Sequence, residues 1–525
     1  MEHTKKRNGF GSGIGFILAA AGSAIGLGNL WSFPYKTSAN GGAAFVITYV
    51  LSAIVIGIIV MVAEIYIGKR AQANPITAYK KTHRNLGWLG LFAILIPFII
   101  VCYYSVLGGY TVKFTLNTFS GNAGKILPFV GNVGDVILFT AIFVVLAVIV
   151  VMGGVKGGIE KASKVLMPLL FLILVAIAIY CLCLGEGVSE GLNFYLNPNF
   201  AELGFEGILA AMSQAFFSLS LGMGIMVSYG SYAGNSVSVA KSVGMIALFD
   251  TLVALLAGLA IFPAVYHYQA IHPGQTLQTG GILLMFETMP IVFETMGTLG
   301  QIVSLFFFAM VVIAALTSVI SLMEVATQFI IQKFKIKRTK AILIVAVVSF
   351  LLSIPIGISL GKTLNGDNSM LICGENYLDF LDKVTNVVLM PLGALGACVA
   401  LGWFTFKGEN KSDTFNPMYL KRKLEEDGLK LGWFGKVFAV MCKYVTPLLI
   451  LVVEIFGVIE FIAPVVDGVR TFSLNGLGIV LTAYGLCAIA IAVYFIFFRN
   501  RETGENADEL HLEKTIPVQD GENKE

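Results

Sequence analysis

The sequence predicts an all-α polytopic membrane protein with twelve membrane-spanning helices and both termini in the cytoplasm. Of its 525 residues, 57% are hydrophobic and 13% are charged, whereas soluble proteins carry about 25% charged residues. Apolar stretches recur along the chain, and they reach the ~20 residues that an α-helix needs to cross the hydrocarbon core. Because these stretches are continuous and do not alternate with polar residues, a transmembrane β-barrel is excluded.

The predicted spans follow from these apolar stretches in chain order. Short polar or glycine-containing segments separate most of them, and a longer charged segment separates the tenth span from the eleventh. The twelve spans are expected at residues 10–36, 41–68, 88–112, 134–152, 162–184, 206–232, 241–268, 297–332, 341–361, 378–404, 439–464 and 477–498.

The Lys and Arg residues indicate how the chain is oriented in the membrane. If the N-terminus is inside, 29 of the 35 lie on its side (35 minus 6), as the positive-inside rule requires. An odd number of spans would place Arg499 and Arg501 outside, which favours twelve. The six residues on the opposite side are Lys36, Lys113, Lys125, Lys362, Lys383 and Arg470.

Two further observations concern the compartment. The seven cysteines are scattered and mostly lie within spans, so we expect no disulfide framework. The single Asn-x-Ser/Thr sequence, Asn410–Ser412, falls on the predicted cytoplasmic side. We therefore expect a multi-pass protein of a bacterial inner membrane.

The first span contains residues that a stable membrane helix does not need. Its centre reads "AAGSAIGLGNLWSFPY" (Ala20–Tyr35), with Gly26-Leu27-Gly28 in the middle. A glycine costs about 1 kcal/mol in a helix interior, and non-helical backbone at membrane depth persists only where protein buries it or it lines a cavity. We expect two half-helices; close helix packing through small residues stays open as the alternative. A dinucleotide fingerprint is disfavoured, because no strand precedes the glycines and the third one is missing.

A second interrupted span supports the first interpretation. The sixth span reads "SQAFFSLSLGMGIMVSYGSY" (Ser213–Tyr232), with Gly222-Met223-Gly224 at its centre. Paired interruptions in two halves of a chain indicate a transporter with its binding site near the membrane midplane. The expected organisation is a cytoplasmic N-terminus (1–9), two inverted five-helix repeats (10–184 and 206–404), a cytoplasmic loop (405–438), the last two helices (439–498) and a disordered cytoplasmic tail (499–525).

Seven motifs, in order along residues 10 to about 405, resemble the neurotransmitter:sodium symporters, in particular their bacterial amino-acid branch. The resemblance implies the LeuT-like 5+5 inverted-repeat fold with unwound first and sixth helices. The motifs are "GSAIGLGNLWSFPY" (Gly22–Tyr35), "NGGAAF" (Asn40–Phe45), "CYYSVLGG" (Cys102–Gly109), "GIEKASKVLMP" (Gly158–Pro168), "GLNFYLNP" (Gly191–Pro198), "FFSLSLGMG" (Phe216–Gly224) and "AALTSVISL" (Ala314–Leu322).

The resemblance implies two sodium ions held by oxygen ligands, which suit a hard cation. The first site would use the Ala24 carbonyl, the Asn29 side chain, the Ser218 carbonyl and hydroxyl, Asp250 and the substrate's carboxylate. The second would use the carbonyls of Gly22, Ile25 and Ala314 and the hydroxyls of Thr317 and Ser318. From the residues alone, an alternative role for Thr317 and Ser318 stays open, in which their hydroxyls bond the backbone of their own helix.

The resemblance also implies an amino-acid site at the two breaks. The substrate carboxylate would meet the amides of Leu27 and Gly28 and the Tyr104 hydroxyl, and its ammonium the carbonyls of Ala24, Phe217 and Ser218 and the Ser220 hydroxyl. In the monoamine branch an Asp stands at the position of Gly26, so the glycine favours a substrate with its own carboxylate. The side-chain pocket would be Ile100, Tyr104, Phe217, Ser220, Met223, Ser318 and Leu322.

The pocket and Asp250 predict the substrate class and the ion requirement. The pocket carries no charge, and the adaptable Met223 side chain suits hydrophobic or aromatic amino acids. An intramembrane carboxylate is costly and marks a functional site by default, and no Lys or Arg occurs between Lys241 and Lys333 to pair with Asp250. Many animal members have Asn there and need chloride, so the resemblance implies chloride-independent transport.

Both gates depart from the family pattern. Ser32 stands where members usually have a basic residue that pairs with an acidic one, here Asp379, and Lys36 is a candidate replacement. The aromatic lid would still be Tyr104 and Phe217. On the inner side, Arg7 and Phe10 match the family's N-terminal latch, but the acidic partner of Arg7 is replaced by Gln332. Glu64 is expected to support the sixth helix, whereas Glu324 has no expected role.

The predicted function is sodium-coupled import of neutral amino acids by alternating access. An amino-acid sensor of the same fold is the alternative, because both gate pairs are altered. A channel is disfavoured by the lack of a repeated filter sequence, and an enzyme by the lack of H-E-x-x-H and G-x-S-x-G motifs. The expected partners are the amino acid, sodium and the lipid bilayer, without nucleic acid; the oligomeric state stays open.

Overall fold

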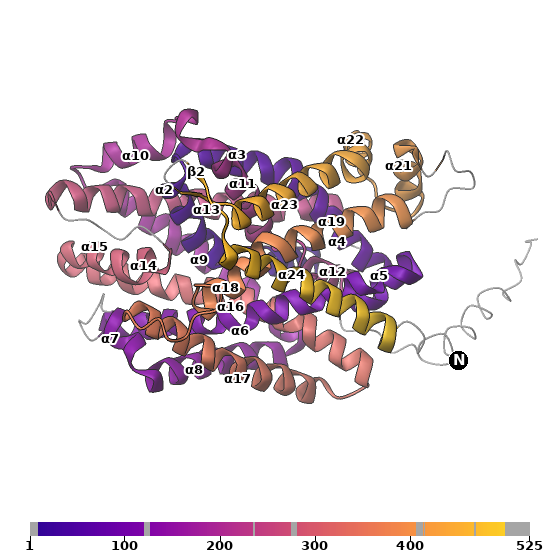
Figure 1. The fold of residues 1–525 in the computed structure, drawn as a ribbon, viewed down its shortest axis with the longest axis horizontal. Coiled ribbons are helices and arrows are strands. Elements are labelled where there is room, and N and C mark those ends of the chain that lie inside the picture. Colours follow the sequence, from indigo (N-terminus) through magenta and orange to yellow (C-terminus); the bar gives the residue numbers. More distant parts are fainter. Residues whose placement is uncertain are drawn as a thin grey trace, which may run out of the picture.

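The computed structural model describes residues 9–119, 126–234, 237–274, 281–405, 413, 415–466 and 469–498, which form a bundle of long helices (Figure 1). Ten of the described helices are long and apolar enough to cross a membrane. One further span is possible where Gly13–Ala24 and Gly28–Ala39 meet at an angle of 47°. The prediction of a polytopic α-helical membrane protein is confirmed; the count of twelve stays a prediction.

The described first half of the chain contains the first broken span, the long third span and three shorter ones. Ser12 begins α1 by accepting a hydrogen bond from the Gly15 amide (3.0 Å), which satisfies one free N–H of the first turn. The elements are α1 (Gly13–Ala24), η1 (Gly28–Ser32), α2 (Phe33–Ala39), α3 (Ala43–Ser52), η2 (Ala53–Gly57), α4 (Ile58–Ala71), α5 (Pro75–Thr82), η3 (Arg84–Leu86), α6 (Gly87–Phe119), α7 (Ile126–Gly131), α8 (Val133–Met152), η4 (Val155–Glu160), α9 (Lys161–Leu182) and α10 (Val188–Leu196).

The second half starts with the second broken span and ends with the helix pair α23 and α24, joined by a short antiparallel hairpin. The elements are α11 (Phe200–Ser218), α12 (Ile225–Ser231), α13 (Val239–Ile271), α14 (Gly281–Leu283), η5 (Leu284–Thr288), α15 (Met289–Thr295), α16 (Gly297–Phe334), α17 (Arg338–Leu364), α18 (Tyr377–Lys383), η6 (Val384–Leu389), α19 (Met390–Val399), η7 (Ala400–Phe404), α21 (Pro417–Glu426), α22 (Phe434–Val440), η8 (Met441–Val445), α23 (Thr446–Ile462), β1 (Val465–Val466), β2 (Val469–Arg470), α24 (Leu474–Val493) and η9 (Tyr494–Phe498).

Packing around the two broken spans positions the site. α1 lies against α13 and α16, and α12 lies against α4. The long helix α6 packs along α16, so it also borders the region around the two broken spans. Figure 1 shows the short helices α10, α14 and α15 at one end of the bundle and α5, α21 and α22 at the other. The first turn of α1, the C-terminal end of α4 and the helix α21 belong to the side that the charge distribution predicts to be cytoplasmic.

Candidate functional site

The first break lies at Ile25–Leu27, between α1 and η1. Ile25 has an extended backbone (φ −74°, ψ 99°), which ends the helix one residue before the predicted Gly26. In a continuous helix the Gly26 amide would bond the Gly22 carbonyl; here it donates to Asn29 Oδ1 (3.2 Å). Helical bonding resumes where the Asn29 amide donates to the Gly26 carbonyl (3.2 Å). The break therefore releases backbone carbonyls at the end of α1, as unwound membrane helices do at ion sites.

The second break lies at Leu219–Gly224, between α11 and α12. Ser220, Gly222 and Gly224 have left-handed backbones, with φ of 53°, 76° and 69°. A Cβ at Gly222 would overlap the Met390 carbonyl oxygen, so this position requires glycine. Glu64 accepts a hydrogen bond from the Gly222 amide (3.2 Å). This contact is the structural support expected of Glu64.

A small cavity of about 30 Å³ lies between the two breaks and α6 and α16. All seven residues of the predicted side-chain pocket line it, together with the predicted Ala24, Gly26 and Gly28. Of the predicted substrate ligands, Leu27 and Ser218 do not line it. The Leu27 amide donates instead to the Tyr104 hydroxyl (2.9 Å). Two lining residues, Ser23 and Ile225, had not been expected in the pocket.

The glycines of the first break leave the space in which this cavity lies. A Cβ at Gly26 would overlap the Ser318 hydroxyl and lie 2.7 Å from the Tyr104 hydroxyl oxygen. A Cβ at Gly28 would lie 3.0 Å from the Phe217 ring. A side chain at either position would therefore have to displace Tyr104, Phe217 or Ser318.

Asp250 is the centre of a buried polar cluster beside the cavity. Its side chain accepts hydrogen bonds from Asn29 Nδ2 (2.8 Å), the Ser218 hydroxyl (2.7 Å) and the Tyr49 hydroxyl (3.1 Å). Asp250 and Asn29 have no exposed surface, and among the described residues no Lys or Arg forms an ion pair with Asp250. A buried carboxylate without a cationic partner is costly, so this cluster can hold a cation through the oxygens of Asp250, Ser218 and Asn29.

Tyr49 was missed by sequence reasoning. It is a single phenol in the second apolar span, and buried tyrosines in such a span are common, so nothing in the sequence distinguishes it. Its contact with both Asp250 and Ser218 (3.1 and 3.0 Å) appears only in the fold.

The residues of the second predicted sodium site come together where α1 meets α16. A Cβ at Gly22 would lie 3.5 Å from Thr317 Cβ, and the Ser318 hydroxyl donates to the Ser23 carbonyl (3.1 Å) and lies 3.5 Å from the Ile25 carbonyl. The Thr317 hydroxyl instead bonds its own helix, at the Ile313 and Ala314 carbonyls (3.0 and 3.1 Å). The ligand types present, carbonyl and hydroxyl oxygens, suit sodium.

At the outer gate, Ser32 takes part in an uncharged contact. Its hydroxyl donates to Gln214 Oε1 (2.9 Å), and Gln214 Nε2 donates to the Gly28 carbonyl (2.9 Å). Lys36 and Asp382 of α18 lie near enough for their charges to interact. Asp379, the predicted acidic gate residue, accepts a hydrogen bond from Asn376 Nδ2 (2.6 Å). The structure thus brings Lys36 near an acidic residue of α18, but a different one from the residue that the sequence suggested.

At the inner gate, Arg7 lies outside the described residues. Phe10 packs edge-on against Phe16 and Tyr229, with ring centroids 5.3 and 5.5 Å apart, and its amide donates to the Tyr232 carbonyl (3.2 Å). Gln332 Oε1 accepts from the Asn74 amide and side chain (2.9 and 2.8 Å). Gln332 therefore joins α16 to the start of α5.

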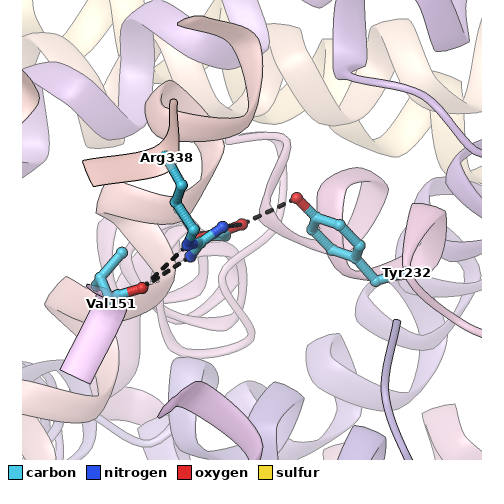
Figure 2. Close-up of polar contacts among 4 residues, drawn as sticks. Val151, Tyr232 and Arg338 are labelled. Atoms are coloured by element: carbon cyan, nitrogen blue, oxygen red, sulfur yellow. Dashed lines mark hydrogen bonds and ion pairs between the residues drawn. The ribbon is translucent and has the colours of Figure 1, made fainter. Parts of the chain in front are cut away.

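Glu324, which had no expected role, takes part in a second inner contact with Arg338 and Tyr232. Figure 2 shows Arg338, Tyr232 and the neighbouring Val151. Its carboxylate forms an ion pair with Arg338 and accepts a hydrogen bond from the Tyr232 hydroxyl (2.9 Å). Arg338 also donates to the Val151 carbonyl through Nε and NH2 (3.1 and 2.9 Å). The Glu324 side chain is fully buried, so this network holds α8, α12, α16 and α17 together at the side that also contains Phe10.

Comparisons with known proteins agree with this architecture. A family model described as the Sodium:neurotransmitter symporter family matches residues 7–129 and 124–500. An uncharacterized sodium-dependent transporter of Bacillus subtilis, YhdH, is 37% identical over 395 residues, which cover 73% of this chain and 85% of YhdH. An uncharacterized sodium-dependent transporter of Haemophilus influenzae is 31% identical over 481 residues, 86% of this chain and 98% of the relative.

A solved structure extends the likeness to the fold. MhsT in complex with L-phenylalanine matches with a TM-score of 0.76 and 35% sequence identity, over 86% of this chain and 100% of MhsT. This match confirms the LeuT-like fold class inferred from the motifs, and the family model confirms the resemblance itself. The relatives are transporters, so the chain is a multi-pass membrane transporter and not an enzyme. The protein belongs to the Sodium:neurotransmitter symporter family.

Proposed function

We propose that this protein is a sodium-coupled importer of neutral, hydrophobic or aromatic L-amino acids that works by alternating access. The observation that carries the proposal is the uncharged cavity at the two helix breaks, directly beside the buried cluster of Asp250, Asn29 and Ser218. L-Phenylalanine in the complex of the related MhsT is consistent with this substrate class. The cavity would have to widen to admit an amino-acid side chain, and the lining Met223 is adaptable.

Coupling between sodium and substrate follows from the shared residues of the site. Asn29 bonds Asp250 through Nδ2 (2.8 Å) and the Gly26 amide through Oδ1 (3.2 Å), so one side chain contacts both the cluster and the cavity wall. In the proposed complex the substrate's carboxylate is itself a sodium ligand. Each ligand then tightens binding of the other by the same factor.

Two sodium ions would supply the energy for accumulation. At −100 mV each inward charge gains about 2.3 kcal/mol, so two gain about 4.6 kcal/mol before any sodium gradient. At 1.4 kcal/mol per decade, this energy supports accumulation of roughly a thousandfold.

Chloride is not required in this proposal. Asp250 supplies a fixed negative charge inside the cluster, and no described cation pairs with it. Sodium therefore meets a counter-charge that belongs to the protein.

Uptake by proteoliposomes tests the proposal. Radiolabelled phenylalanine or leucine should accumulate when an inward sodium gradient is imposed and should not accumulate with potassium or N-methylglucamine in its place. Unlabelled hydrophobic and aromatic amino acids should compete, whereas aspartate and lysine should not. Binding without uptake would support the sensor alternative, and sodium-independent uptake would contradict the proposal.

A further inference from the structure

A second cavity, of about 460 Å³, lies at the end of the molecule that the charge distribution predicts to be cytoplasmic. Three segments form it: the last turns of α4, the start of α13 and the residues that follow α21. Its volume lies within the ~300–1,000 Å³ of typical small-molecule pockets, and it shares no lining residue with the cavity at the breaks. It is lined by Tyr66, Lys69, Arg70, Val237, Ser238, Val239, Ala240, Asp427, Gly428, Leu429 and Lys430.

Three cationic side chains and one carboxylate line this cavity. Arg70 Nε lies 3.3 Å from Asp427 Oδ2, and the Tyr66 hydroxyl donates to the same carboxylate. The ammonium of Lys69 donates to the Val237 carbonyl (2.6 Å), which is neutral. Lys430 has no hydrogen-bond or ion-pair partner within the described part of the chain. Among the described residues that line the cavity, Arg70 matches the charge of Asp427, and the two lysines carry positive charge in excess of it.

The backbone adds to this positive charge. Ser238 precedes α13, and its side chain makes no capping hydrogen bond. The N–H groups of the first turn of a helix have no partner within the helix and carry the positive end of its dipole. Val239 and Ala240 of that turn line the cavity together with Lys69 and Lys430.

We propose that this cavity is a binding site for a phosphate-type anion, supplied either by the headgroup of an anionic lipid or by a soluble phosphate compound. Lys69 and Lys430 would donate charge-assisted hydrogen bonds to the phosphate oxygens. The site is independent of the proposed amino-acid site, so it is tested by binding and not by uptake.

The test compares the purified wild-type protein with Lys69→Gln/Lys430→Gln, with Lys430→Gln alone and with Lys436→Gln as control. Lys436 lies in α22 on the same side, is exposed and does not line the cavity. One arm measures binding of radiolabelled phosphate and pyrophosphate by equilibrium dialysis in detergent. The other counts phosphatidylglycerol retained by native mass spectrometry after extraction from nanodiscs of phosphatidylcholine and phosphatidylglycerol.

We expect affinity to fall about tenfold for each lysine removed, since a charge-assisted hydrogen bond contributes roughly the 1.4 kcal/mol of one decade. Lys436→Gln should bind like the wild type. If the lysine variants retain less phosphatidylglycerol than the wild type, the ligand is a lipid headgroup. If they bind less phosphate or pyrophosphate in dialysis, the ligand is a soluble phosphate compound. The proposal is overturned if the wild type binds neither probe, or if the lysine variants bind like Lys436→Gln. Lys430→Gln, at an exposed position outside the spans, keeps the test valid should the double variant fail to fold.

Discussion

Gly26 shows how a single missing side chain can set the chemistry of the site. A Cα hydrogen stands where another residue would have its Cβ, and a larger group there would occupy the space of the Ser318 and Tyr104 hydroxyls. The residue therefore leaves the cavity without a charge of its own. In our proposal the substrate brings the negative charge, which restricts it to compounds with a carboxylate.

Replacement Gly26→Ala is expected to lower substrate affinity by at least about tenfold, because the new methyl group overlaps Ser318 and approaches Tyr104 to 2.7 Å. Scintillation proximity binding of labelled phenylalanine measures the effect. Gly485→Ala is the matched control, since nothing lies within 4 Å of the methyl group that it adds. Equal affinity of the two variants would argue against this site.

The charge of Asp250 leads to a second prediction at this scale. Asp250→Asn keeps the shape of the side chain and removes the counter-charge of the cluster, so uptake in chloride-free medium should fall at least about tenfold and recover in part when chloride is added. Uptake in chloride and gluconate media measures the effect. Asp367→Asn, at an exposed ion pair far from the site in sequence, should behave like the wild type in both media. Unchanged uptake of Asp250→Asn in gluconate would contradict the role given to this carboxylate.

Single residues were predictable where a motif carries them. The seven pocket residues meet in one cavity because the motifs fix where both spans break. Tyr49, Gln214 and Ser23 were not predictable, because their roles depend on contacts between distant spans. The Ser23 carbonyl accepts from the hydroxyls of Ser220 and Ser318 (3.0 and 3.1 Å), and no local pattern indicates this.

At the scale of elements, the second break depends on backbone geometry that only glycine adopts without strain. Gly222→Ala should destabilise the protein by more than about 3 kcal/mol, because the backbone at this position is left-handed and the added methyl group overlaps the Met390 carbonyl. Gly366→Ala separates the two causes, since Gly366 has a similar φ (82°) but open space around it. Thermal unfolding in detergent should show a much smaller shift for this control, and equal shifts would mean that the contact with α19 contributes nothing.

The ion pair between α16 and α17 gives a further prediction. Arg338→Gln leaves the fully buried Glu324 without its cation and should cost about 3–5 kcal/mol. The double variant Glu324→Gln/Arg338→Gln should be more stable than Arg338→Gln alone, because no charge is then left buried. Lys340→Gln, exposed on the same helix, serves as control. A double variant no more stable than Arg338→Gln would rule out the charge as the cause.

Element boundaries were predictable to within about seven residues, as at the end of α6 (112 predicted, Phe119 observed), whereas the type of each break was less predictable. The first helix ends at Ala24 because Ile25 takes an extended conformation. An isoleucine in an apolar span does not by itself predict such an end. In the sixth span the polar Ser218 and Ser220 and the glycines indicated an interruption. The structure shows that the interruption extends over Leu219–Gly224 and holds three left-handed residues.

At the scale of the whole molecule, eleven of the predicted spans overlap long helices or the bent pair of the structure. The remaining predicted span, the sixth (residues 206–232), is divided between α11 and α12. Neither of these helices is both long and apolar enough to be recognised as a span by itself. Apolar length predicted the bundle because the bilayer sets that length. It did not predict the inner contacts of Phe10, Glu324 and Arg338, which join helices far apart in sequence.

The central claim is that sodium and an amino acid bind together at the two breaks, and sodium-dependent binding tests it most directly. The Kd of labelled phenylalanine for the purified protein is measured over a range of sodium concentrations, with ionic strength held constant by N-methylglucamine. The account predicts that the Kd falls steadily as sodium rises and that no saturable binding occurs without sodium. A Kd that is the same in sodium and in N-methylglucamine would contradict it.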